Sequence, residues 1–250
     1  MLDRKSVLIT GASGGLGALV ANHLTAHGAH VVALGRTRPA GVDGFLHHDL
    51  SNPQGLEAAA EVIKTGRWDI LVNLAGVQHF GPVEQEDPEH LVSGYMVNLV
   101  APVRLSQAVV PGMKARGSGQ IVNIGSIFGS INFAHFVTYS SAKAGLRGFS
   151  QALRRELADT GVDVTYVAPR AVRTAMITEQ VMEFARLTQM NLDAPDVTAR
   201  QIVTAIQQRK RDVYLGFPES VFVRLNALMP GLVDRALSAN DRRAAQLFAR

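Results

Sequence analysis

The sequence predicts an α/β domain with a doubly wound parallel sheet, in which helices cover both faces. Short runs of apolar and β-branched residues alternate with segments whose apolar residues recur at helical spacing. The strand-like runs are continuously apolar, which is typical of strands buried between two helix layers. The chain has 250 residues and is 47% hydrophobic, enough for one sizeable core. Because no linker or repeat interrupts it, we expect a single domain over residues 1–250.

The first elements follow in order from local signals. A strand is predicted over residues 6–10, where a short apolar run ends at Gly11. Apolar residues then recur at helical spacing over residues 15–27, and Gly28 ends this predicted helix. Residues 30–34 form a second apolar run, which predicts a second strand.

The connection after this second strand is short. Only twelve residues, 37–48, precede Asp49, and they include one proline and two glycines. A crossover helix followed by a strand needs more chain than this, so we expect a loop or one helical turn. A helix is predicted to start at residues 52–53, with proline in its first turn, and residues 69–73 predict the next strand.

The second half continues the alternation. A helix is predicted from residues 87–88 to about residue 110, followed by a strand over 120–124. A further helix is expected over 138–160, a strand over 162–167 and a last strand over 213–215.

Composition excludes several kinds of protein. The absence of cysteine excludes disulfides, thiolate metal sites and thiol catalysis. No apolar run of signal-peptide or membrane-spanning length occurs, so we expect a cytoplasmic protein. The net charge is +4, but Lys and Arg are scattered, and no nucleic-acid partner is expected. The spacing of His, Asp and Glu predicts no metal site.

A glycine-rich loop follows the first predicted strand. Residues 10–17 read Thr-Gly-Ala-Ser-Gly-Gly-Leu-Gly and lead directly into the first predicted helix. Glycines let the backbone approach a pyrophosphate, and the helix N-terminus offers free N–H groups. The pattern predicts a dinucleotide-binding loop, against the alternative of a glycine-rich turn without a ligand. The expected contacts are Gly11, Ser13, Gly15, Leu16 and Gly17.

Further motifs follow the glycine loop in order. They are Asn73-Leu74-Ala75-Gly76, Asn98, Ser126, the Tyr139-x-x-x-Lys143 pair and the turn from Pro169 to Thr174. Together with the glycine loop, this series resembles the short-chain dehydrogenase/reductase family, whose members have a Rossmann fold. The chain departs from the family pattern at Leu74, where the family has Asn, and at Arg170, where it has Gly. The resemblance covers residues 5 to about 215 and implies a nicotinamide-dependent oxidoreductase acting on a small carbonyl or alcohol substrate.

The end of the second strand bears on the choice of cofactor. An acid there binds the ribose hydroxyls of NAD, whereas an arginine accommodates the 2′-phosphate of NADP. Gly35 takes the acidic position, and Arg36 follows it, with Thr37 beside it. We therefore expect NADP(H) rather than NAD(H), against the alternative that Arg36 is only a solvated side chain. The resemblance also implies cofactor contacts from Asp49, Leu50, Asn73, Ala75, Gly76, Tyr139, Lys143, Pro169, Val172 and Thr174.

Tyr139 and Lys143 are four residues apart, so they share one face of the predicted helix. Free tyrosine titrates near pH 10, and a nearby cation lowers the pKa of a phenol, so we expect Lys143 to activate Tyr139. The resemblance implies that Tyr139 is the proton donor, that Ser126 orients the substrate oxygen, and that Asn98 holds a water near Lys143. The alternatives are an ordinary half-buried tyrosine beside a surface lysine, and polar groups that bond only to the backbone.

The predicted substrate contacts are mostly apolar. They are Ile127, Phe128, Phe133, His135, Phe136 and Met176. Residues 175–194 are rich in Met and other apolar residues, and in the family this stretch is a mobile lid. An apolar ketone or aldehyde fits such a lining better than a sugar does. The alternative is that these residues only pack in the core.

Residues 217–250 predict a C-terminal helical extension, with apolar residues at helical intervals and a basic end that includes Arg250. We expect this extension to pack on the protein itself or on a second subunit, and peripheral membrane contact is the alternative. The resemblance implies a homodimer or homotetramer formed through the helices that contain Asn98 and Tyr139.

Three functions remain open from the sequence. The first is NADPH-dependent reduction of a ketone or aldehyde, and the second is reduction of a 3-oxoacyl thioester. The third is a cofactor-sensing protein without turnover.

Arg170 either changes the local turn or contacts the cofactor or an anionic substrate.

Overall fold

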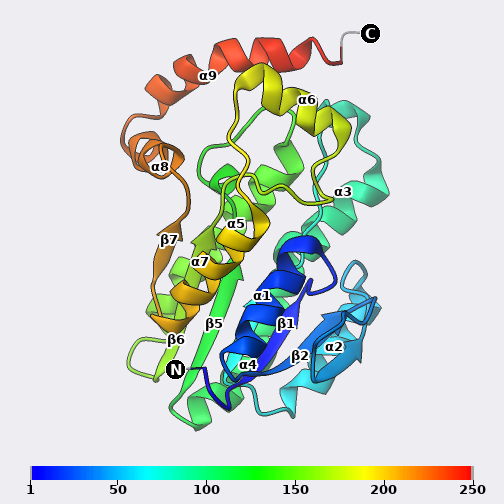
Figure 1. Ribbon diagram of the computed structural model, residues 1–250, viewed down its shortest axis with the longest axis vertical. Helices are drawn as coiled ribbons and strands as arrows, with labels where there is room; N and C mark the ends of the chain where they lie inside the picture. Colours follow the sequence, from blue (N-terminus) through cyan, green and yellow to red (C-terminus); the bar gives the residue numbers. More distant parts are fainter. Residues whose placement is uncertain (1, 249–250) are drawn as a thin grey trace.

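The computed structural model describes residues 2–248, and these form one seven-stranded sheet in which every paired strand is parallel. The strand order is β3-β2-β1-β4-β5-β6-β7 (Figure 1). The strands are β1 (Ser6–Thr10), β2 (His30–Gly35), β3 (Gly44–His47), β4 (Ile70–Asn73), β5 (Gly119–Ile124), β6 (Val162–Ala168) and β7 (Asp212–Tyr214). The predicted doubly wound parallel sheet is confirmed.

Helices cover both faces of this sheet. They are α1 (Gly15–Ala26), α2 (Pro53–Lys64), α3 (Pro88–Tyr95), α4 (Ala101–Ala115), α5 (Val137–Glu156), α6 (Glu179–Thr188), α7 (Pro195–Gln207), α8 (Glu219–Leu228) and α9 (Pro230–Ala245). Val20 of α1 and Ile202 of α7 pack on one face, and Ile63 of α2 and Leu105 of α4 pack on the other. Burial of these apolar side chains stabilises the layered arrangement.

Side-chain caps start two of these helices at the predicted places. The side chain of Asn52 accepts a hydrogen bond of 2.8 Å from the N–H of Gly55 at the start of α2. Asp87 accepts one of 2.9 Å from the N–H of His90 at the start of α3. Both caps are followed by a proline, which needs no hydrogen bond in the first turn.

The connection between β2 and β3 is a loop over residues 36–43, in agreement with the prediction that it is too short for a full helix. Strand β3 was not predicted; it pairs with β2 from Val32 opposite Gly44 to Gly35 opposite His47. This strand lies at the edge of the sheet and is only partly buried, so it lacks the continuous apolar run of the inner strands.

The single helix predicted from residues 87–88 to about residue 110 is three segments. It comprises α3, a π-helical turn over Met96–Val100, and α4, which ends at Ala115. Two local features account for the interruption. The side-chain amide of Asn98 donates to the carbonyl oxygen of Gly94, and Pro102 lacks the N–H that would bond to the carbonyl of Asn98 in an α-helix.

The C-terminal extension packs on the rest of the chain. Helix α9 contacts α6, and both lie together at the upper end of the molecule in Figure 1. Ala244 of α9 is buried in a cluster with Phe128, Phe136 and Phe184. The described residues therefore agree with packing within the protein, although Arg250 lies outside them.

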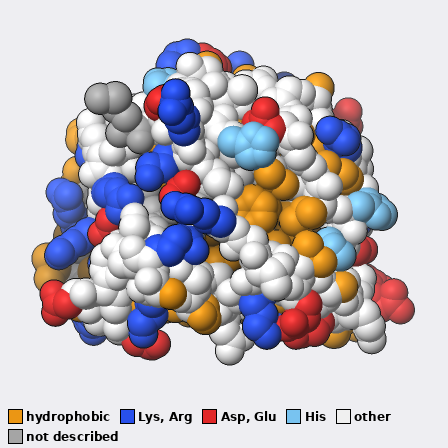
Figure 2. All heavy atoms as spheres, turned by 90° about the horizontal axis from the view of Figure 1, so that it is seen from below, with side chains coloured by type: hydrophobic (Ala, Val, Ile, Leu, Met, Phe, Trp, Pro, Cys, Tyr) orange, Lys and Arg blue, Asp and Glu red, His pale blue; other side chains and the backbone are white. Residues whose placement is uncertain are grey.

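The surface carries charges of both signs. Figure 2 shows Lys and Arg side chains spread over the face at the lower end of Figure 1, with Asp and Glu between them. Within residues 2–248, none of the helices has the length and hydropathy required to span a membrane.

Candidate active site

A cavity of about 570 Å³ lies at the carboxyl ends of β1, β4 and β5. In this fold the crossover direction reverses between β1 and β4, and such switch points are where ligands bind. Thr10 ties the two strand ends together, because its Oγ1 accepts hydrogen bonds from the N–H groups of Leu74 and Ala75, at 3.0 and 3.1 Å. The cavity is therefore bounded by strand ends that the sheet itself brings together.

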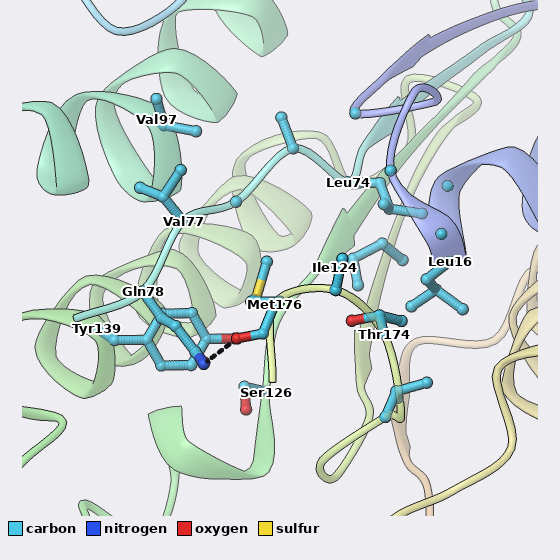
Figure 3. A pocket seen from close by; sticks show the side chains of 18 of the residues that line it. Leu16, Leu74, Val77, Gln78, Val97, Ile124, Ser126, Tyr139, Thr174 and Met176 are labelled. Carbon is cyan, nitrogen blue, oxygen red and sulfur yellow. Dashed lines mark hydrogen bonds between the residues drawn. The ribbon is translucent and has the colours of Figure 1, made fainter. Parts of the chain in front are cut away.

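Most of the residues predicted for the site line this cavity. They are Gly11, Ser13, Gly15, Leu16, Gly17, Arg36, Asp49, Leu50, Ala75, Gly76, Ser126, Phe128, Phe136, Tyr139, Lys143, Pro169, Val172, Thr174 and Met176. They come from segments spread over more than half of the sequence. Figure 3 shows Ser126, Tyr139, Thr174 and Met176 around the same space.

Three residues predicted as substrate contacts do not line the cavity. Ile127 packs with Val223 of α8 in a separate buried cluster. Phe133 lies behind Phe128, with ring centroids 4.4 Å apart. His135 lies against another aromatic ring, that of Phe80, at 6.3 Å. The first two fill the layer between the cavity wall and the C-terminal extension, so the structure assigns them packing contacts.

Three residues predicted for the cofactor or catalytic set also lie outside the lining. Thr37 is exposed beside the cavity. Asn73 is buried, and its amide donates a hydrogen bond of 2.8 Å to the side chain of Asn123 on the neighbouring strand, so its role is to join β4 to β5. Asn98 lies one layer behind the lining and acts on it through the loop after β4.

The glycine loop forms an open cradle at the start of α1. Gly11 has φ +75°, and a Cβ there would lie 2.7 Å from the Cα of Ala75. A Cβ on Gly17 would lie 2.1 Å from the carbonyl oxygen of Gly11. No side chain caps the N-terminus of α1, so its first N–H groups are free to bind an anion. This cradle fits a pyrophosphate.

The opposite end of the cavity holds the groups expected to distinguish the two nicotinamide cofactors. The exposed Arg36 lines it, and a Cβ on Gly35 would meet no atom within 4 Å. The pKa of Asp49 lies below its usual value, because its carboxylate accepts hydrogen bonds from the N–H and the hydroxyl of Ser51 and lies near Arg36. This end of the cavity thus offers one cation from the end of β2, one ionised carboxylate from the segment after β3, and room for a larger group.

Tyr139 and Lys143 lie on one face of α5, as the spacing predicts. Burial raises the pKa of Tyr139, and the adjacent Ser126 hydroxyl partly offsets this rise. Burial lowers the pKa of Lys143 to about 8. The Nζ of Lys143 lies 5.8 Å from the centroid of the tyrosine ring. Desolvation thus sets the direction of both pKa shifts, and the activation of Tyr139 by Lys143 stays a prediction.

Ser126 is positioned by the turn that follows β5. Its Oγ accepts a hydrogen bond of 3.1 Å from the N–H of Phe128, so it caps the short 3-10 helix over Ile127–Gly129. A bond from Ser126 to the backbone, which the alternative interpretation predicts, is thus present. It leaves the hydroxyl proton available to donate toward the cavity, which Ser126 also lines.

Asn98 sits in the π-helical turn and holds the loop after β4. Its Oδ1 accepts from the N–H of Val77 at 3.3 Å, and its Nδ2 donates to the carbonyl of Val77 at 2.7 Å. A Cβ on Gly76 would lie 3.0 Å from Asn98 Oδ1 and 3.6 Å from Lys143 Nζ. The two polar groups therefore flank the same glycine, on the side of the cavity where a relay to Lys143 is expected.

Some residues that line the cavity were not predicted. They include His90, Ser93 and Val97, which project from α3 and the π-helical turn. Their spacing of three and four residues is a helical signal that could have placed them on one face with the loop after β4. Gln78, from that loop, donates a hydrogen bond of 2.8 Å to the carbonyl of Met176, which bridges two walls of the cavity (Figure 3).

Arg170 occupies the position where a glycine was expected. Its guanidinium donates to both carboxylate oxygens of Asp193, at 2.7 and 2.9 Å, and to Glu219 at 2.9 Å. It also donates to the carbonyl of Phe217. These bonds tie the loop after β6 to α8. Arg170 also lines the cavity, so its contact with the cofactor or an anionic substrate stays a prediction.

A cluster of potential metal ligands lies beside the cavity, although the spacing in the sequence predicted none. His79, Glu86 and His90 each bring one nitrogen or oxygen to within 4.8 Å of the others. Glu86 and His90 are four residues apart at the start of α3, a spacing that could have indicated their proximity.

The fold and these motifs match known proteins. The model of the short chain dehydrogenase family matches residues 5–185. A dehydrogenase/reductase SDR family member 7B of Danio rerio is 31% identical over 97% of this chain and 87% of its own length. The 3-oxoacyl-(acyl-carrier-protein) reductase FabG of Escherichia coli strain K12 is 35% identical over 70% of this chain and 76% of its own.

Solved structures agree. A short-chain dehydrogenase from Streptomyces avermitilis is 28% identical with a TM-score of 0.78, covering 96% of this chain and 98% of that one. A short-chain dehydrogenase from Sphingobium yanoikuyae in complex with NADPH is 27% identical with a TM-score of 0.77, covering 92% and 95%. The family match spans most of the chain, from the glycine loop through the Tyr139-x-x-x-Lys143 pair. The chain belongs to the short-chain dehydrogenase/reductase family and is an NAD(P)-dependent oxidoreductase.

Proposed function

We propose that the protein is an NADPH-dependent reductase that converts an apolar ketone or aldehyde to an alcohol. The observation that carries this proposal is the convergence of Tyr139, Ser126 and Lys143 on a cavity that runs to the glycine loop and Arg36. The cradle suits a pyrophosphate, and Arg36 supplies the cation for a 2′-phosphate. The relative from Sphingobium yanoikuyae, which is in complex with NADPH, is consistent with this choice of cofactor.

When bound, NADPH supplies the hydride for the carbonyl carbon. The residues of this chain handle the oxygen and the proton. Ser126 donates a hydrogen bond to the carbonyl oxygen and fixes its position, while the hydroxyl of Tyr139 transfers its proton to that oxygen. The charged form of Lys143 favours the phenolate that remains. Asn98, across Gly76 from Lys143, holds a water through which the proton is replaced.

The substrate side of the cavity is largely apolar. Phe128 and Phe136 come from the segment before and at the start of α5, and Ile177, Val181 and Met190 come from the stretch around α6. Such a lining gains from burying apolar surface and offers few partners for hydroxyl groups. This composition supports an apolar carbonyl compound over a sugar.

The second candidate function is reduction of a 3-oxoacyl thioester, favoured by the names of relatives such as the reductase of Escherichia coli. This function would require the chain to bind an acidic carrier protein. Binding of that kind needs unpaired basic residues of this chain beside the cavity. Arg104 is instead paired with Glu57, and Arg154 is paired with Asp212. These two arginines are therefore already neutralised by partners within the chain, and the apolar lining of the cavity leaves the apolar ketone as the first choice.

We also propose a homodimer or homotetramer formed through the helical segments that contain Asn98 and Tyr139, with membrane contact by the C-terminal extension as a separate alternative. Val100 and Val137, which lie next to or in these helices, are 41% and 48% exposed. Exposed valines on neighbouring helices support a homodimer or homotetramer that covers them.

On the C-terminal extension, Leu228 is 81% exposed and supports the alternative of membrane contact.

The decisive experiment follows NADPH absorbance across ketones, aldehydes, quinones and acyl thioesters. Tyr139→Phe removes only the hydroxyl, so we expect turnover to fall by about 10²- to 10⁴-fold while NADPH binding persists. Tyr214→Phe, which alters a tyrosine outside the cavity lining, is the matched control and should keep full turnover. Unchanged turnover in Tyr139→Phe contradicts the proposal, and NADPH binding without turnover of any substrate favours the sensor alternative.

A further inference from the structure

A buried carboxylate and two histidines meet beside the substrate side of the cavity. His79 lies in the loop after β4, Glu86 just before α3, and His90 in the first turn of α3. One ligand atom from each lies within 4.8 Å of the other two. We propose that His79, Glu86 and His90 bind a divalent transition-metal ion, with Zn²⁺ as the best match to two imidazoles and one carboxylate.

The charge on Glu86 is the first argument. Its side chain is 1% exposed, and in the described part of the chain its only ion-pair partner is His90, with 3.2 Å between Glu86 Oε1 and His90 Nδ1. Neither Lys nor Arg pairs with it there. A buried carboxylate is stable only when it is paired or coordinates a metal. A dication between the carboxylate and the two imidazoles supplies a permanent counter-charge.

His79 gives the second, independent argument. Its Nε2 is buried and has no hydrogen-bond partner. Buried polar atoms in native proteins nearly always have a partner, and an orphan calls for an explanation such as an ion. Imidazole nitrogen is a preferred ligand of Zn²⁺. Coordination by His79 through a ring nitrogen therefore engages a side chain that the protein alone leaves unsatisfied.

The geometry is close to that of a tetrahedral site. Bonds of about 2.0–2.1 Å place tetrahedral ligand atoms about 3.4 Å apart. Glu86 Oε1 and His90 Nδ1 are already 3.2 Å apart. His79 must approach by a little over an ångström at most, and its loop contains neither helix nor strand that would prevent this. Three protein ligands leave a fourth position for water.

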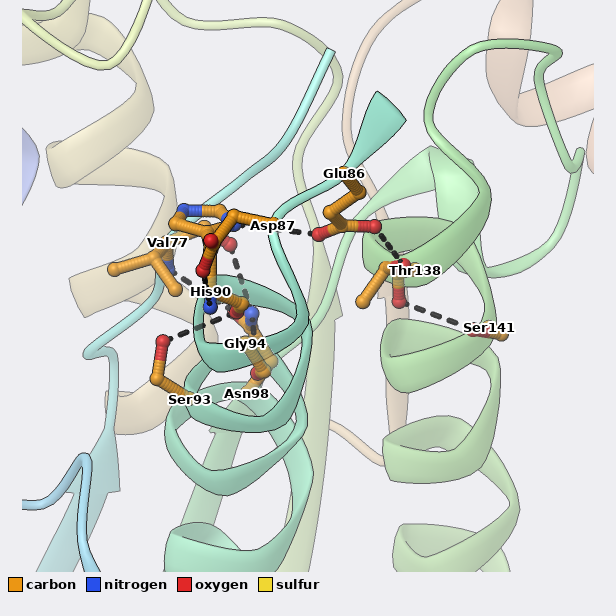
Figure 4. A network of polar contacts seen from close by, with 9 residues as sticks. All are labelled: Val77, Glu86, Asp87, His90, Ser93, Gly94, Asn98, Thr138 and Ser141. Carbon is orange, nitrogen blue, oxygen red and sulfur yellow. Dashed lines mark hydrogen bonds and ion pairs between the residues drawn. The ribbon is translucent and has the colours of Figure 1, made fainter. Parts of the chain in front are cut away.

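A hydrogen bond to the second carboxylate oxygen completes the site. Thr138 Oγ1 donates to Glu86 Oε2 at 2.5 Å, and Thr138 immediately precedes Tyr139 in α5 (Figure 4). Metal-bound carboxylates are held in orientation by such outer contacts. Since His90 also lines the cavity, the bound ion joins the loop after β4, α3 and α5 at the edge of the proposed substrate site.

The test is metal binding to the untagged, chelator-treated full chain, measured by isothermal titration calorimetry with ZnCl₂ and by native mass spectrometry. We expect one Zn²⁺ per chain and a rise in melting temperature on binding. His79→Ala, His90→Ala and Glu86→Gln should each weaken binding by about 10-fold or more, since each removes a ligand or its charge. His47→Ala, which alters an exposed histidine of β3, is the control and should bind as the unaltered protein does.

A second readout tests the geometry. Co²⁺ in place of Zn²⁺ should give visible absorption bands of a four-coordinate site in the unaltered protein and in His47→Ala, and these bands should be lost in Glu86→Gln. Circular dichroism of each variant confirms that it is folded. Absence of saturable binding overturns the proposal, and so does binding that survives unchanged in the three ligand variants. Neither readout depends on turnover, so this result and the test of the reductase activity are separate.

Discussion

Lys143 donates a hydrogen bond of 3.0 Å from its Nζ to the backbone carbonyl oxygen of Ile124, the last residue of β5. The lysine is only 3% exposed, and the bond fixes α5 against the strand end that carries Ser126. The same contact holds the ammonium group beside the ring of Tyr139. Burial lowers the pKa of Lys143 to about 8, which links the stability of the protein to pH.

We predict that Lys143→Met removes this pH dependence. Below pH 8 the lysine is charged in both folded and unfolded chains, and burying the charge destabilises the fold by about 3 kcal/mol, at 1.36 kcal/mol per pKa unit. Between about pH 8 and 10.5 the unfolded chain binds more protons, so the free energy of unfolding contributed by this group rises with pH. The methionine variant lacks that rise.

Urea unfolding at pH 7, 9 and 10.5 measures the effect. Relative to the unaltered protein, the Lys143→Met variant should be most stable at pH 7. This advantage in unfolding free energy should become smaller toward pH 10.5. Lys114→Met, at an exposed lysine of α4, should show no such trend. Parallel curves for Lys143→Met and the unaltered protein contradict the prediction.

Asn98→Ala should destabilise the protein more than the loss of an ordinary side chain. Asn98 is 1% exposed, and it satisfies the N–H and carbonyl of Val77 and the carbonyl of Gly94. Leaving buried backbone groups without partners costs about 1–3 kcal/mol each, so we expect a loss of about 3 kcal/mol or more in thermal or urea unfolding. Asn226→Ala, which removes one bond to Ser130, should lose about 1 kcal/mol, and equal losses count against this role.

Cofactor preference should depend on the end of β2. Arg36→Ala should weaken NADPH binding by about 10- to 100-fold, which corresponds to a hydrogen-bonded charge pair, and leave NADH binding almost unchanged. Gly35→Asp should reverse the preference, because a side chain there meets no atom within 4 Å and places a carboxylate where the 2′-phosphate is expected.

Nicotinamide fluorescence titrations with NADPH and NADH give the dissociation constants. Arg38→Ala is the control, since this exposed arginine does not line the cavity. If Arg36→Ala weakens both cofactors equally, the arginine contributes general attraction rather than recognition of the phosphate.

The inner strands and their order of appearance could be predicted because burial on both faces leaves a continuous apolar run in the sequence. The edge strand β3 could not, since half-exposed residues carry no such signal. The π-helical turn was also missed. Pro102 is a local signal for it, but the side-chain bonds of Asn98 to Gly94 and to the loop after β4 have no signature in the sequence pattern.

The site follows the same division. Residues placed directly after strands could be located, because the carboxyl ends of parallel strands share one edge of the sheet. For neighbouring residues within a turn, the sequence does not show which side chain faces the cavity and which faces the core. Phe128 lines the cavity, while Ile127 beside it packs on α8. The ion-pair partners of Arg170 could not be predicted either, since Asp193 and Glu219 lie far from it in the sequence.

These ion pairs provide the last prediction. Arg170 and its two partners are each about 20% exposed, so water screens them less than a surface pair. We expect a double-mutant cycle of Arg170→Ala and Asp193→Ala to give a coupling free energy of about 1–3 kcal/mol in urea unfolding. A cycle at Arg186 and Glu183, a largely exposed pair within α6, should give about 0.5 kcal/mol or less.

The same substitution should reach the proposed active site. Arg170 lies at the start of the loop from which Val172 and Thr174 line the cavity. Its ion pair with Glu219 holds that loop to the start of α8. Arg170→Ala removes the bonds that hold the loop and the stretch around α6 in place. Substrate binding must then order both segments, and the entropic cost of that ordering weakens binding. We therefore expect KM to rise several-fold with a smaller change in kcat. A fall in kcat at constant KM argues instead that Arg170 acts on the chemical step.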